Sequence, residues 1–576
     1  MKITKEHVIE ILKKAKKPLK AKEIAREIEG VDRHEVNAFL YNNVKTFKKE
    51  EGDVWVYIGS KKGFDKEDKS KSKTRKIKED APKKNYCLLE RLKKIYGSGA
   101  EFHPGQEEAI LDLLNGKKTI VVQKTSWGKS LVYFMAIKIL REEKKGPAII
   151  VSPLLALMKD QTYGKKEVDN QNLTVEYINS TNKPDWPSIY EKIRKDKVDA
   201  IMIAPEKLDN AKFLEEIEKI IPKVSLFVID EAHCIADWGH DFRPDYMRIL
   251  GFIKKLKKGT PVLATTATAN NRVIEDIKSQ IGNDVIIRRG NLDRYNFKID
   301  ILNLETEANK MEWLYKYLPI LSAKNPGIVY CLTRRACKAV AQKLKEHNIN
   351  AEMYHAQMSD EEKNDIAERF KKKKIKVLVA TIAYGMGIDN SEIAFVVHYH
   401  KPANFVDYYQ QIGRAGRSEQ KIKDAYAIML CGNKDDTINK RFIYNAFPSE
   451  YDMRRVLSYI EKRPKQGLKR ITEAMVDIDE ESYDEDKVKQ ILSLLSIDGA
   501  ISKNSSSQYS RTSTIWRYNS VEIEGRRNQR LKELNEFNKF VLSNQCYMRT
   551  IRDALLDKDA TKCNRCAICK KKHFYE

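Results

Sequence analysis

The chain has 576 residues, with 107 lysines and arginines against 82 acidic residues and a formal net charge of +25. At roughly 150 residues per domain this length predicts three to five domains, and a hydrophobic content of 41% excludes wholesale disorder. No apolar stretch reaches about 18 residues, so we expect no transmembrane helix. The positive charge favours nucleic acid as a partner, with a merely solubilising lysine-rich surface as the alternative.

Four of the nine cysteines lie near the C-terminal end. Nine cysteines are an odd number and too sparse in this chain for a disulfide scaffold, so the pattern favours one metal site and a reducing cytoplasm (association with the nucleoid if the source is bacterial). The N-terminus lacks the apolar segment of a signal peptide. We expect the other cysteines to be buried apolar side chains: Cys87, Cys234, Cys331, Cys337 and Cys431.

Residues 1–60 are predicted to form a small separate unit. Apolar positions recur with helical spacing around Val8 and Ile24, a third helix is expected over 32–44, and residues 53–58 alternate like a strand. Three short helices and a terminal hairpin are typical of a winged helix, whose third helix would contact DNA. Such a unit can also dock a protein.

A charged linker over 61–85 precedes a change of pattern. From there, short apolar runs alternate with amphipathic helices, which indicates parallel sheets covered on both faces. We therefore predict an α/β protein with two tandem domains, 86–293 and 294–447. The runs assigned to strands are 119–123, 148–152, 200–204, 226–230, 261–266, 327–331, 376–381 and 395–399.

Beyond residue 447 no further strand of this kind is expected. Residues 448–520 show three helical segments and then a Ser/Thr-rich strand pair ending at 515–518, which predicts a second winged-helix-like segment. A charged helix over 524–542 begins the last segment, 521–576, and the four clustered cysteines follow it.

Residues 123–130 (QKTSWGKS) lie between a predicted strand and a predicted helix. In a P-loop, backbone N–H groups at such a helix start hold phosphates; Lys129 would reach the terminal phosphates and Ser130 would ligate Mg²⁺. A chance strand-to-helix turn is the alternative, because the pattern requires Gly at position 123. The predicted nucleotide-binding residues are Gln123, Lys124, Thr125, Ser126, Trp127, Gly128, Lys129 and Ser130.

Residues 226–233 (LFVIDEAH) run from an apolar strand into two adjacent acids. Asp230 would hold Mg²⁺ through water, and Glu231 would orient and deprotonate the attacking water. The purely structural alternative is a strand end followed by a helix cap, but it does not explain two adjacent acids at the carboxyl end of a strand. Together with the P-loop they predict an NTPase.

Residues 230–246 read DEAHCIADWGHDFRPDY, which closely resembles motif II and the aromatic-rich loop of the RecQ family of DNA helicases. The resemblance covers about residues 87–576. The other motifs occur in family order: motif 0 at 102–106, motif Ia at 151–161, the family element after motif Ia at 204–208, motif III at 266–269, motif IV at 328–333, motif V at 380–389 and motif VI at 408–417.

The resemblance implies two RecA-like domains that bind ATP in their cleft. Gln106 would read the adenine edge, and Arg417, beside Arg414, would neutralise charge on the γ-phosphate. It also adds Gln410 to the catalytic residues, and Gly385 and Asp389 to the nucleotide-binding ones. In the aromatic-rich loop, three side chains suit stacking on an unpaired base and one suits a phosphate, core packing being the alternative. These are Trp238, His240 and Phe242, and Arg243.

Three positions depart from the family pattern. Ser126 and Trp127 replace a small, usually glycine-containing stretch, and a positive φ at Ser126 would cost about a kcal/mol. His103 stands where the family usually has an arginine near the adenine. We expect ATP binding to survive these changes, in a weakened form.

The cysteine cluster suits a closed tetrahedral zinc site. An iron–sulfur cluster is the alternative, and His573 could replace one ligand. By resemblance such a module packs against the helicase core, although here it follows the winged-helix-like segment. The predicted ligands are Cys546, Cys563, Cys566 and Cys569.

These observations predict an ATP-, Mg²⁺- and Zn²⁺-dependent DNA helicase of RecQ type. By resemblance it would translocate 3′ to 5′ on single-stranded and partly duplex DNA in recombination or repair, together with single-strand-binding or recombination proteins and without membrane contact. An RNA helicase and a DNA-stimulated ATPase that remodels nucleoprotein are the enzymatic alternatives. The non-enzymatic alternative is a winged-helix DNA-binding regulator with a decayed ATPase.

Overall fold

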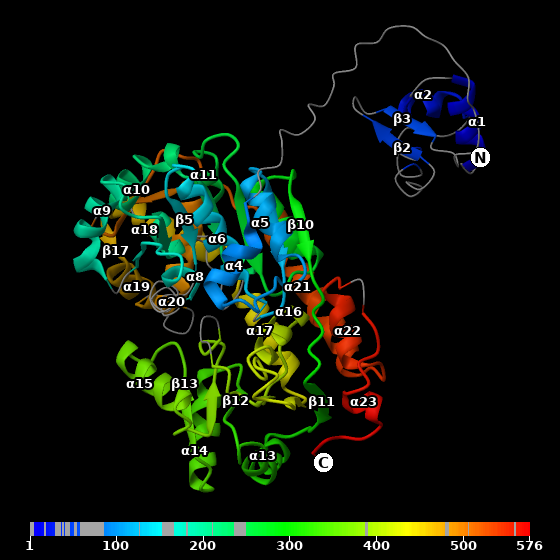
Figure 1. Ribbon diagram of the computed structural model, residues 1–576, viewed down its shortest axis with the longest axis vertical. Coiled ribbons are helices and arrows are strands. Elements are labelled where there is room, and N and C mark those ends of the chain that lie inside the picture. Colours follow the sequence, from blue (N-terminus) through cyan, green and yellow to red (C-terminus); the bar gives the residue numbers. More distant parts are fainter. Residues whose placement is uncertain are drawn as a thin grey trace. The chain divides into compact units, whose positions relative to one another are not determined.

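The computed structural model divides into two compact units, Met1–Lys84 and Asn85–Glu576 (Figure 1). The structure describes residues 5–15, 19–28, 36, 40, 47–50, 54–57, 86–125, 127–152, 166–179, 182–209, 211–235, 249–385, 390–477, 483–504, 506–557 and 560–575.

The first unit packs helices on a small antiparallel sheet with strand order β1-β3-β2. Val8, Leu12 and Ile24 are buried in its core, as their helical spacing requires. Leu19 begins a short strand that pairs with Trp55. Most of the predicted third helix lies outside the described residues. The elements are α1 (Lys5–Ala15), β1 (Leu19–Lys20), α2 (Ala21–Arg26), β2 (Phe47–Glu50) and β3 (Val54–Tyr57).

The second unit begins with a parallel sheet in the order β10-β4-β9-β8-β5-β7-β6. Its strands are β4 (Lys118–Val122), β5 (Ala148–Val151), β6 (Val175–Ile178), β7 (Ala200–Ile203), β8 (Leu226–Ile229), β9 (Val262–Thr266) and β10 (Ile286–Arg289). Its helices are α4 (Leu88–Tyr96), α5 (Gln106–Leu114), α6 (Lys129–Glu142), α8 (Lys166–Asp169), α9 (Trp186–Arg194), α10 (Ala211–Glu218), α11 (Ile249–Ile253) and α12 (Asn271–Ile281). Short 3-10 turns are η1 (Lys183–Asp185), η2 (Pro205–Asp209), η3 (Ile221–Lys223) and η4 (Ala232–Ile235).

A second parallel sheet follows, in the order β11-β16-β15-β12-β14-β13. Its strands are β11 (Phe297–Asn303), β12 (Gly327–Tyr330), β13 (Ala351–Tyr354), β14 (Val377–Ala380), β15 (Phe395–His398) and β16 (Ala425–Cys431). Its helices are α13 (Glu307–Leu321), α14 (Arg334–Glu346), α15 (Asp360–Lys371), α16 (Phe405–Ile412) and α17 (Asp435–Asn445). Two RecA-like α/β domains are thereby confirmed.

All eight runs assigned to strands form strands, and four of the five strands that sequence reasoning missed in these two sheets are edge strands. β10 and β6 are the edges of the first sheet, and β11 and β13 are the edges of the second. An edge strand is less completely covered, so it tolerates polar residues that break the apolar run. Of the strands missed in these two sheets, β16 alone lies inside one.

The segment after the second sheet contains three helices and a three-stranded antiparallel sheet in the order β17-β19-β18. The prediction that its strand pair ends at 515–518 is wrong, since β19 ends at Arg511. Trp516 leaves the sheet because its indole Nε1 donates to Asp498 Oδ2 at 2.8 Å and its ring is buried in the local core. The elements are α18 (Glu450–Lys462), β17 (Gln466–Gly467), α19 (Leu468–Val476), α20 (Glu485–Ile497), β18 (Ile501–Lys503) and β19 (Gln508–Arg511).

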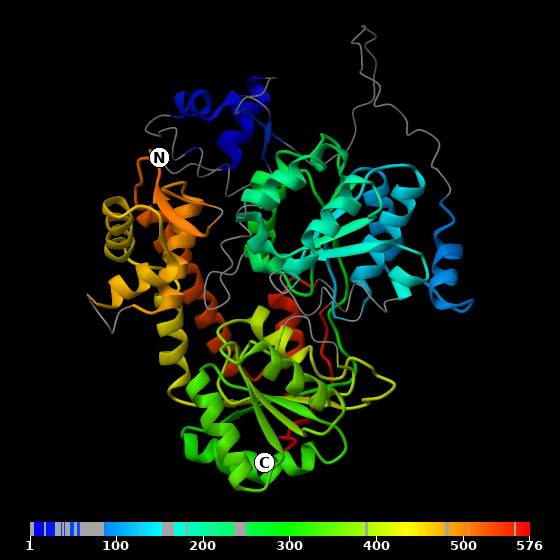
Figure 2. The same cartoon turned by 90° about the vertical axis from the view of Figure 1, so that its left-hand side faces the viewer.

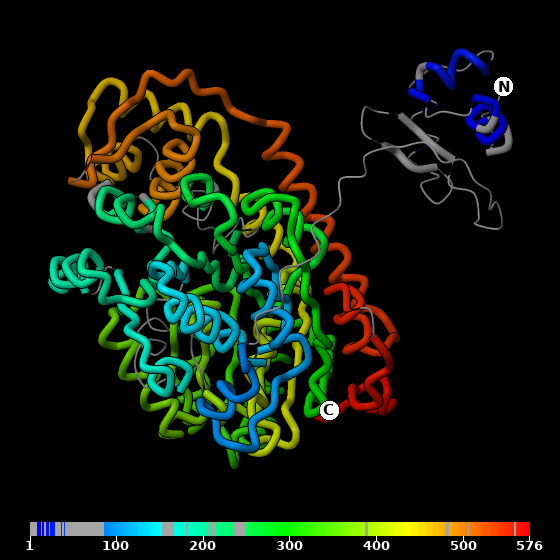
Figure 3. Tube along the Cα trace, turned by 45° about the horizontal axis from the view of Figure 1, so that its top comes forward, coloured from blue at the N-terminus to red at the C-terminus, as the bar shows by residue number. Residues whose placement is uncertain are grey.

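Helix α21 (Ser520–Val541) connects this segment to the cysteine cluster (Figures 2 and 3). α22 (Tyr547–Ala554) and α23 (Ala567–Lys570) follow and contact β11 of the second sheet. α21 has 22 residues, yet no described helix is long and apolar enough to cross a membrane. Of the five cysteines expected to be buried, Cys87 is exposed because it precedes α4 at the surface, and the other four are buried.

Candidate nucleotide site and cysteine cluster

The predicted P-loop connects β4 to α6, so its backbone lies at the carboxyl end of an interior strand of the sheet. Gly128 has φ +88°, and a Cβ there would lie 2.7 Å from Gln106 Nε2, so only glycine fits. Lys129 begins α6, and its Nζ donates to the carbonyl of Gln123 at 3.1 Å. Ser126 lies outside the described residues.

Motif 0 is fastened to the P-loop by hydrogen bonds. Gln106 is buried; its Oε1 accepts from the backbone N–H of His103 at 2.8 Å, and its Nε2 donates to the carbonyl of Trp127 at 2.6 Å. Trp127 is also buried, and its indole donates to the carbonyl of Pro104 at 3.2 Å. The unusual tryptophan therefore fixes the P-loop against motif 0, a contact that the sequence did not indicate.

The two acids follow β8 at the same edge of the sheet. Asp230 is 5% exposed and accepts from Thr265 Oγ1 of β9 at 2.5 Å. Burial, followed by the charge of Glu231, raises the pKa of Asp230 to about 6. Burial also disfavours ionised Glu231, but His233, which lies 3.3 Å away, together with Lys129 and Arg414, outweighs it and lowers the pKa of Glu231.

Charged groups of both domains lie around Asp230 and Glu231. Burial lowers the pKa of Lys129, which interacts electrostatically with both acids and with both motif VI arginines. Burial and then the charge of Arg417 lower the pKa of Arg414 to about 10, and its Nε has no hydrogen-bond partner among the described residues. Three cations around two acids leave an excess of positive charge, which suits a polyphosphate. The buried carboxylate of Asp230 likewise suits a divalent cation, which would offset its desolvation.

A chain of hydrogen bonds runs from the acids across to the second domain. His233 Nδ1, beside Glu231, lies 3.2 Å from Thr266 Oγ1, and this hydroxyl donates to the carbonyl of Thr268 at 2.9 Å. Gln410 Nε2 of α16 donates to Thr268 Oγ1 at 2.8 Å. Motif III, a weak signal in the sequence, therefore joins the predicted water-activating acid to motif VI.

The structure describes some of the remaining predicted site residues and not others. Ser130 begins α6 with Lys129, but its Oγ lies 3.5 Å from Glu167 Oε1. Gly385 follows β14, where a Cβ would lie 2.6 Å from the carbonyl of Ile382. Asp389 and the predicted DNA-contacting side chains lie outside the described residues; the latter are Trp238, His240, Phe242 and Arg243.

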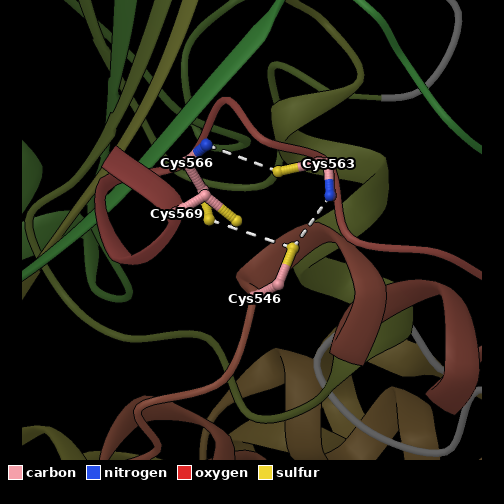
Figure 4. A group of neighbouring side chains, drawn as sticks. All are labelled: Cys546, Cys563, Cys566 and Cys569. Carbon is pink, nitrogen blue, oxygen red and sulfur yellow. Dashed lines mark hydrogen bonds between the residues drawn. The ribbon is translucent and has the colours of Figure 1, made fainter. Parts of the chain in front are cut away.

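The four C-terminal cysteines gather in one place (Figure 4). Their sulfur atoms lie within 4.8 Å of one another, and Cys566 Sγ is 4.0 Å from Cys546 Sγ. A zinc tetrahedron with bonds of about 2.3 Å has sulfur–sulfur distances near 3.8 Å, so the arrangement fits this ion. Cys563 Sγ accepts backbone N–H groups of Arg565 at 3.4 Å and Cys566 at 3.3 Å, which stabilise a thiolate.

His573, the predicted replacement ligand, is engaged elsewhere. Its Nδ1 lies 2.7 Å from the buried carboxylate of Asp300, whose other oxygen accepts the backbone N–H of Phe574 at 2.8 Å. The indole of Trp313 donates to the carbonyl of Tyr575 at 3.0 Å. The residues after the cluster therefore dock on the second domain, and the four cysteines alone are left as the candidate donor set among the described residues.

Comparison with known proteins identifies the class. The DEAD/DEAH box helicase family matches residues 103–277, and the helicase conserved C-terminal domain matches residues 309–419. In Bacillus subtilis, the probable ATP-dependent DNA helicase RecS is 32% identical over 392 residues, which cover 68% of this chain and 76% of that protein. The ATP-dependent DNA helicase RecQ of Pasteurella multocida is 33% identical over 333 residues, 58% of this chain and 50% of that protein.

Among solved structures, the DUF1998 helicase MrfA bound to DNA and AMPPNP has a TM-score of 0.52 at 18% identity, covering 74% of this chain and 62% of that one. This likeness supports the fold alone. The two matched families and the two RecA-like sheets define an ATP-dependent helicase. The chain belongs to the RecQ family of ATP-dependent DNA helicases. It spans about half the length of the matched RecQ relative.

Replacing Gln106 with alanine is expected to raise the KM for ATP about tenfold, because the buried hydrogen bond from Gln106 to the carbonyl of Trp127 in the P-loop and the hydrogen bond from His103 within motif 0 are both lost. Steady-state ATPase measurements with ATP and with GTP check this, and weaker preference for ATP would accompany adenine reading. Gln342→Ala is the matched control, since this exposed glutamine bonds to Glu346 in its own helix. An unchanged KM in the Gln106 variant would contradict the expectation.

Proposed function

We propose that the chain couples Mg²⁺-dependent ATP hydrolysis to 3′-to-5′ translocation on single-stranded DNA and to unwinding of duplex DNA in recombination or repair. The observation that carries this proposal is the convergence of Lys129, Asp230 and Glu231 from the first domain with Arg414 and Arg417 from the second. Such a site is complete only when both domains contribute, so hydrolysis can change their separation.

Each group has a distinct task in this scheme. Lys129 binds the terminal phosphates, and Asp230 with Ser130 would hold Mg²⁺, which would neutralise phosphate charge. Ionised Glu231 accepts a proton from the attacking water, because its low pKa keeps it charged. The two arginines stabilise charge that develops on the γ-phosphate. Gln410 of the second domain donates to Thr268 of the first, so this hydrogen bond couples the nucleotide state of the first domain to the position of the second.

DNA contact belongs, in this proposal, to the aromatic-rich loop and to two winged helices. Trp238, His240 and Phe242 would stack on bases, and Arg243 would contact a phosphate. The antiparallel sheets of residues 1–60 and 448–520, each with helices beside it, support the winged-helix interpretation. The domain boundaries near 293 and 447 and a zinc-binding segment 521–576 are part of the same proposal.

A strand-displacement assay tests the function directly. Duplexes with 3′ or 5′ tails, forks and RNA hybrids are compared with and without ATP, and Lys129→Ala is the inactive control. We expect ATP-dependent displacement from the 3′-tailed duplex and the fork. Preference for the 5′ tail would contradict the polarity, and stronger stimulation by RNA would favour the RNA-helicase alternative. ATPase activity no higher than that of the control would support the decayed-enzyme alternative.

A further inference from the structure

The short segment that joins the two domains contains charged residues that are almost fully buried. Asp293 is 7% exposed and Arg294 is 3% exposed. Buried charges require partners, and neither residue belongs to one of the predicted motifs. Their contacts therefore show what this segment holds together.

Arg294 joins the P-loop of the first domain to motif VI of the second. Its Nη1 donates to Thr125 Oγ1 at 3.1 Å. Its Nη2 donates to the carbonyls of Ala415 at 3.0 Å and Gly416 at 2.6 Å. Thr125 Oγ1 also lies 3.4 Å from the carbonyl of Gly413. One guanidinium thus fixes the spacing between the loop that would hold the phosphates and the loop that carries the arginines.

The motif VI loop depends on such contacts because glycines and an alanine alternate with its arginines. Gly416 has φ +60°, and a Cβ there would lie 2.4 Å from Asn296 Nδ2, which donates to the carbonyl of Gly416 at 2.8 Å. Gly413, Ala415 and Gly416 have no long side chains that could anchor the loop. Its backbone carbonyls, held by Arg294 and Asn296, therefore determine where Arg414 and Arg417 point.

The other side of the segment is held by the cysteine cluster. Arg565, between Cys563 and Cys566 in the sequence, donates from Nη2 to Asp293 Oδ1 at 2.8 Å. Arg552 Nε bonds to Asp557 Oδ2 at 2.7 Å, and the same carboxylate oxygen accepts the backbone N–H of Leu292 at 2.9 Å. The segment 292–294 is therefore held on one side by residues of the C-terminal cysteine module. On its other side, the same segment holds the P-loop and the motif VI loop.

We infer that Arg294 is a positioning residue for ATP hydrolysis and that Arg565 of the cysteine cluster keeps it in place through Asp293. This inference rests on the proposed function of the nucleotide site. Arg294 acts through the motif VI loop, and the geometry of the four cysteines fixes Arg565. Displacing a catalytic group by about 1 Å can cost roughly a hundredfold in rate, so the cysteine cluster contributes to turnover as well as to stability.

The test compares Arg294→Ala, Arg294→Lys, Arg565→Ala and the double alanine variant of the full chain. We expect kcat of the DNA-stimulated ATPase to fall about a hundredfold in Arg294→Ala and about tenfold in Arg565→Ala, with KM for ATP changed by less than about threefold. Arg294→Lys should recover part of kcat, since an ammonium can still donate to the carbonyls. The double variant should be no slower than Arg294→Ala, because both changes release the same loop.

Metal content and thermal unfolding accompany the kinetics. Arg565→Ala should keep about one metal ion per chain, because it removes no thiolate. If Arg294→Ala does not fold, Arg565→Ala still tests the inference, because the Arg565 side chain is 26% exposed and its removal disturbs the core less. Arg288→Ala is the matched control, because it also removes an arginine that forms a two-point ion pair, with Asp112 at 2.8 and 3.0 Å. The kcat of this variant should be unchanged.

Three results would overturn the inference: unchanged kcat in Arg565→Ala, losses that multiply in the double variant, or a rise of KM that accounts for the whole loss of kcat/KM. These are distinct from failure of the proposed function. If the proposed function fails, the parent protein itself shows no DNA-stimulated ATPase. If only the inference fails, the parent is active and the variants do not show the expected changes in kcat.

Discussion

Replacing Arg417 with alanine is expected to slow ATP hydrolysis by about a thousandfold or more at saturating DNA. Arg417 interacts electrostatically with Lys129 of the P-loop and with Arg414, so it belongs to the charged groups where the terminal phosphates would lie. An arginine that meets charge developing in the transition state contributes to the rate more than to ground-state binding. Affinity for ATP should therefore change by less than about threefold, as measured by titration with a fluorescent ATP analogue.

Two further variants make this result interpretable. Arg369→Ala removes a surface arginine of the same domain that pairs with Asp365 and Glu352, and it should hydrolyse ATP like the parent. Lys129→Ala should lose both affinity and rate, because Lys129 would contact the phosphates in the ground state as well. An Arg417 variant that loses affinity as steeply as rate would place this arginine with the binding residues instead.

Replacing Cys566 with serine is expected to reduce bound zinc from about one ion per chain to a small fraction of that value. The side chain is 1% exposed, and its sulfur is one of four that gather within 4.8 Å, so the remaining three thiolates leave the tetrahedron open. Binding of structural zinc contributes about 10 kcal/mol or more in small domains, and part of that free energy would hold the C-terminal segment on the second domain. The midpoint of thermal unfolding should fall by roughly 10 °C.

Metal analysis and thermal unfolding monitored by circular dichroism check this prediction. Cys87→Ser is the matched control, because this cysteine is exposed and distant in sequence from the cluster, and it should alter neither measurement. Retention of a full equivalent of zinc in the Cys566 variant would contradict the assignment of this ligand. A brown parent protein that absorbs near about 400 nm would point to an iron–sulfur cluster.

The predicted motifs and the predicted fold agree because both depend on local sequence. A near-continuous apolar run such as 226–230 specifies a buried parallel strand without help from its neighbours, and so the following acids were placed correctly at its carboxyl end. The edge strands were missed since a strand such as β13 has a neighbouring strand on one side alone and carries a mixed sequence. Likewise, nothing in the local pattern at Trp516 shows that it leaves the sheet to bond with Asp498.

Residues whose role comes from distant partners could not be predicted. Arg294 looks like an ordinary linker arginine until folding places it between Thr125 and Gly416, which are separated from each other by almost the whole length of two domains. Trp127 looks like a defect in the P-loop sequence, and the structure shows that its indole bonds to Pro104. His573 looks like a spare zinc ligand, but folding places it beside Asp300.

The sequence by itself indicated two parallel-sheet domains, a P-loop pattern, two adjacent acids and three closely spaced cysteines, because each of these patterns depends on neighbours within a few residues. Only the tertiary structure decided that Gln106 and Trp127 lock together, that Gln410 reaches Thr268, and that the cysteine cluster is tied to the nucleotide loops through Asp293 and Arg294. Those contacts join residues that are well separated in the chain, and folding within and between the domains brings them together.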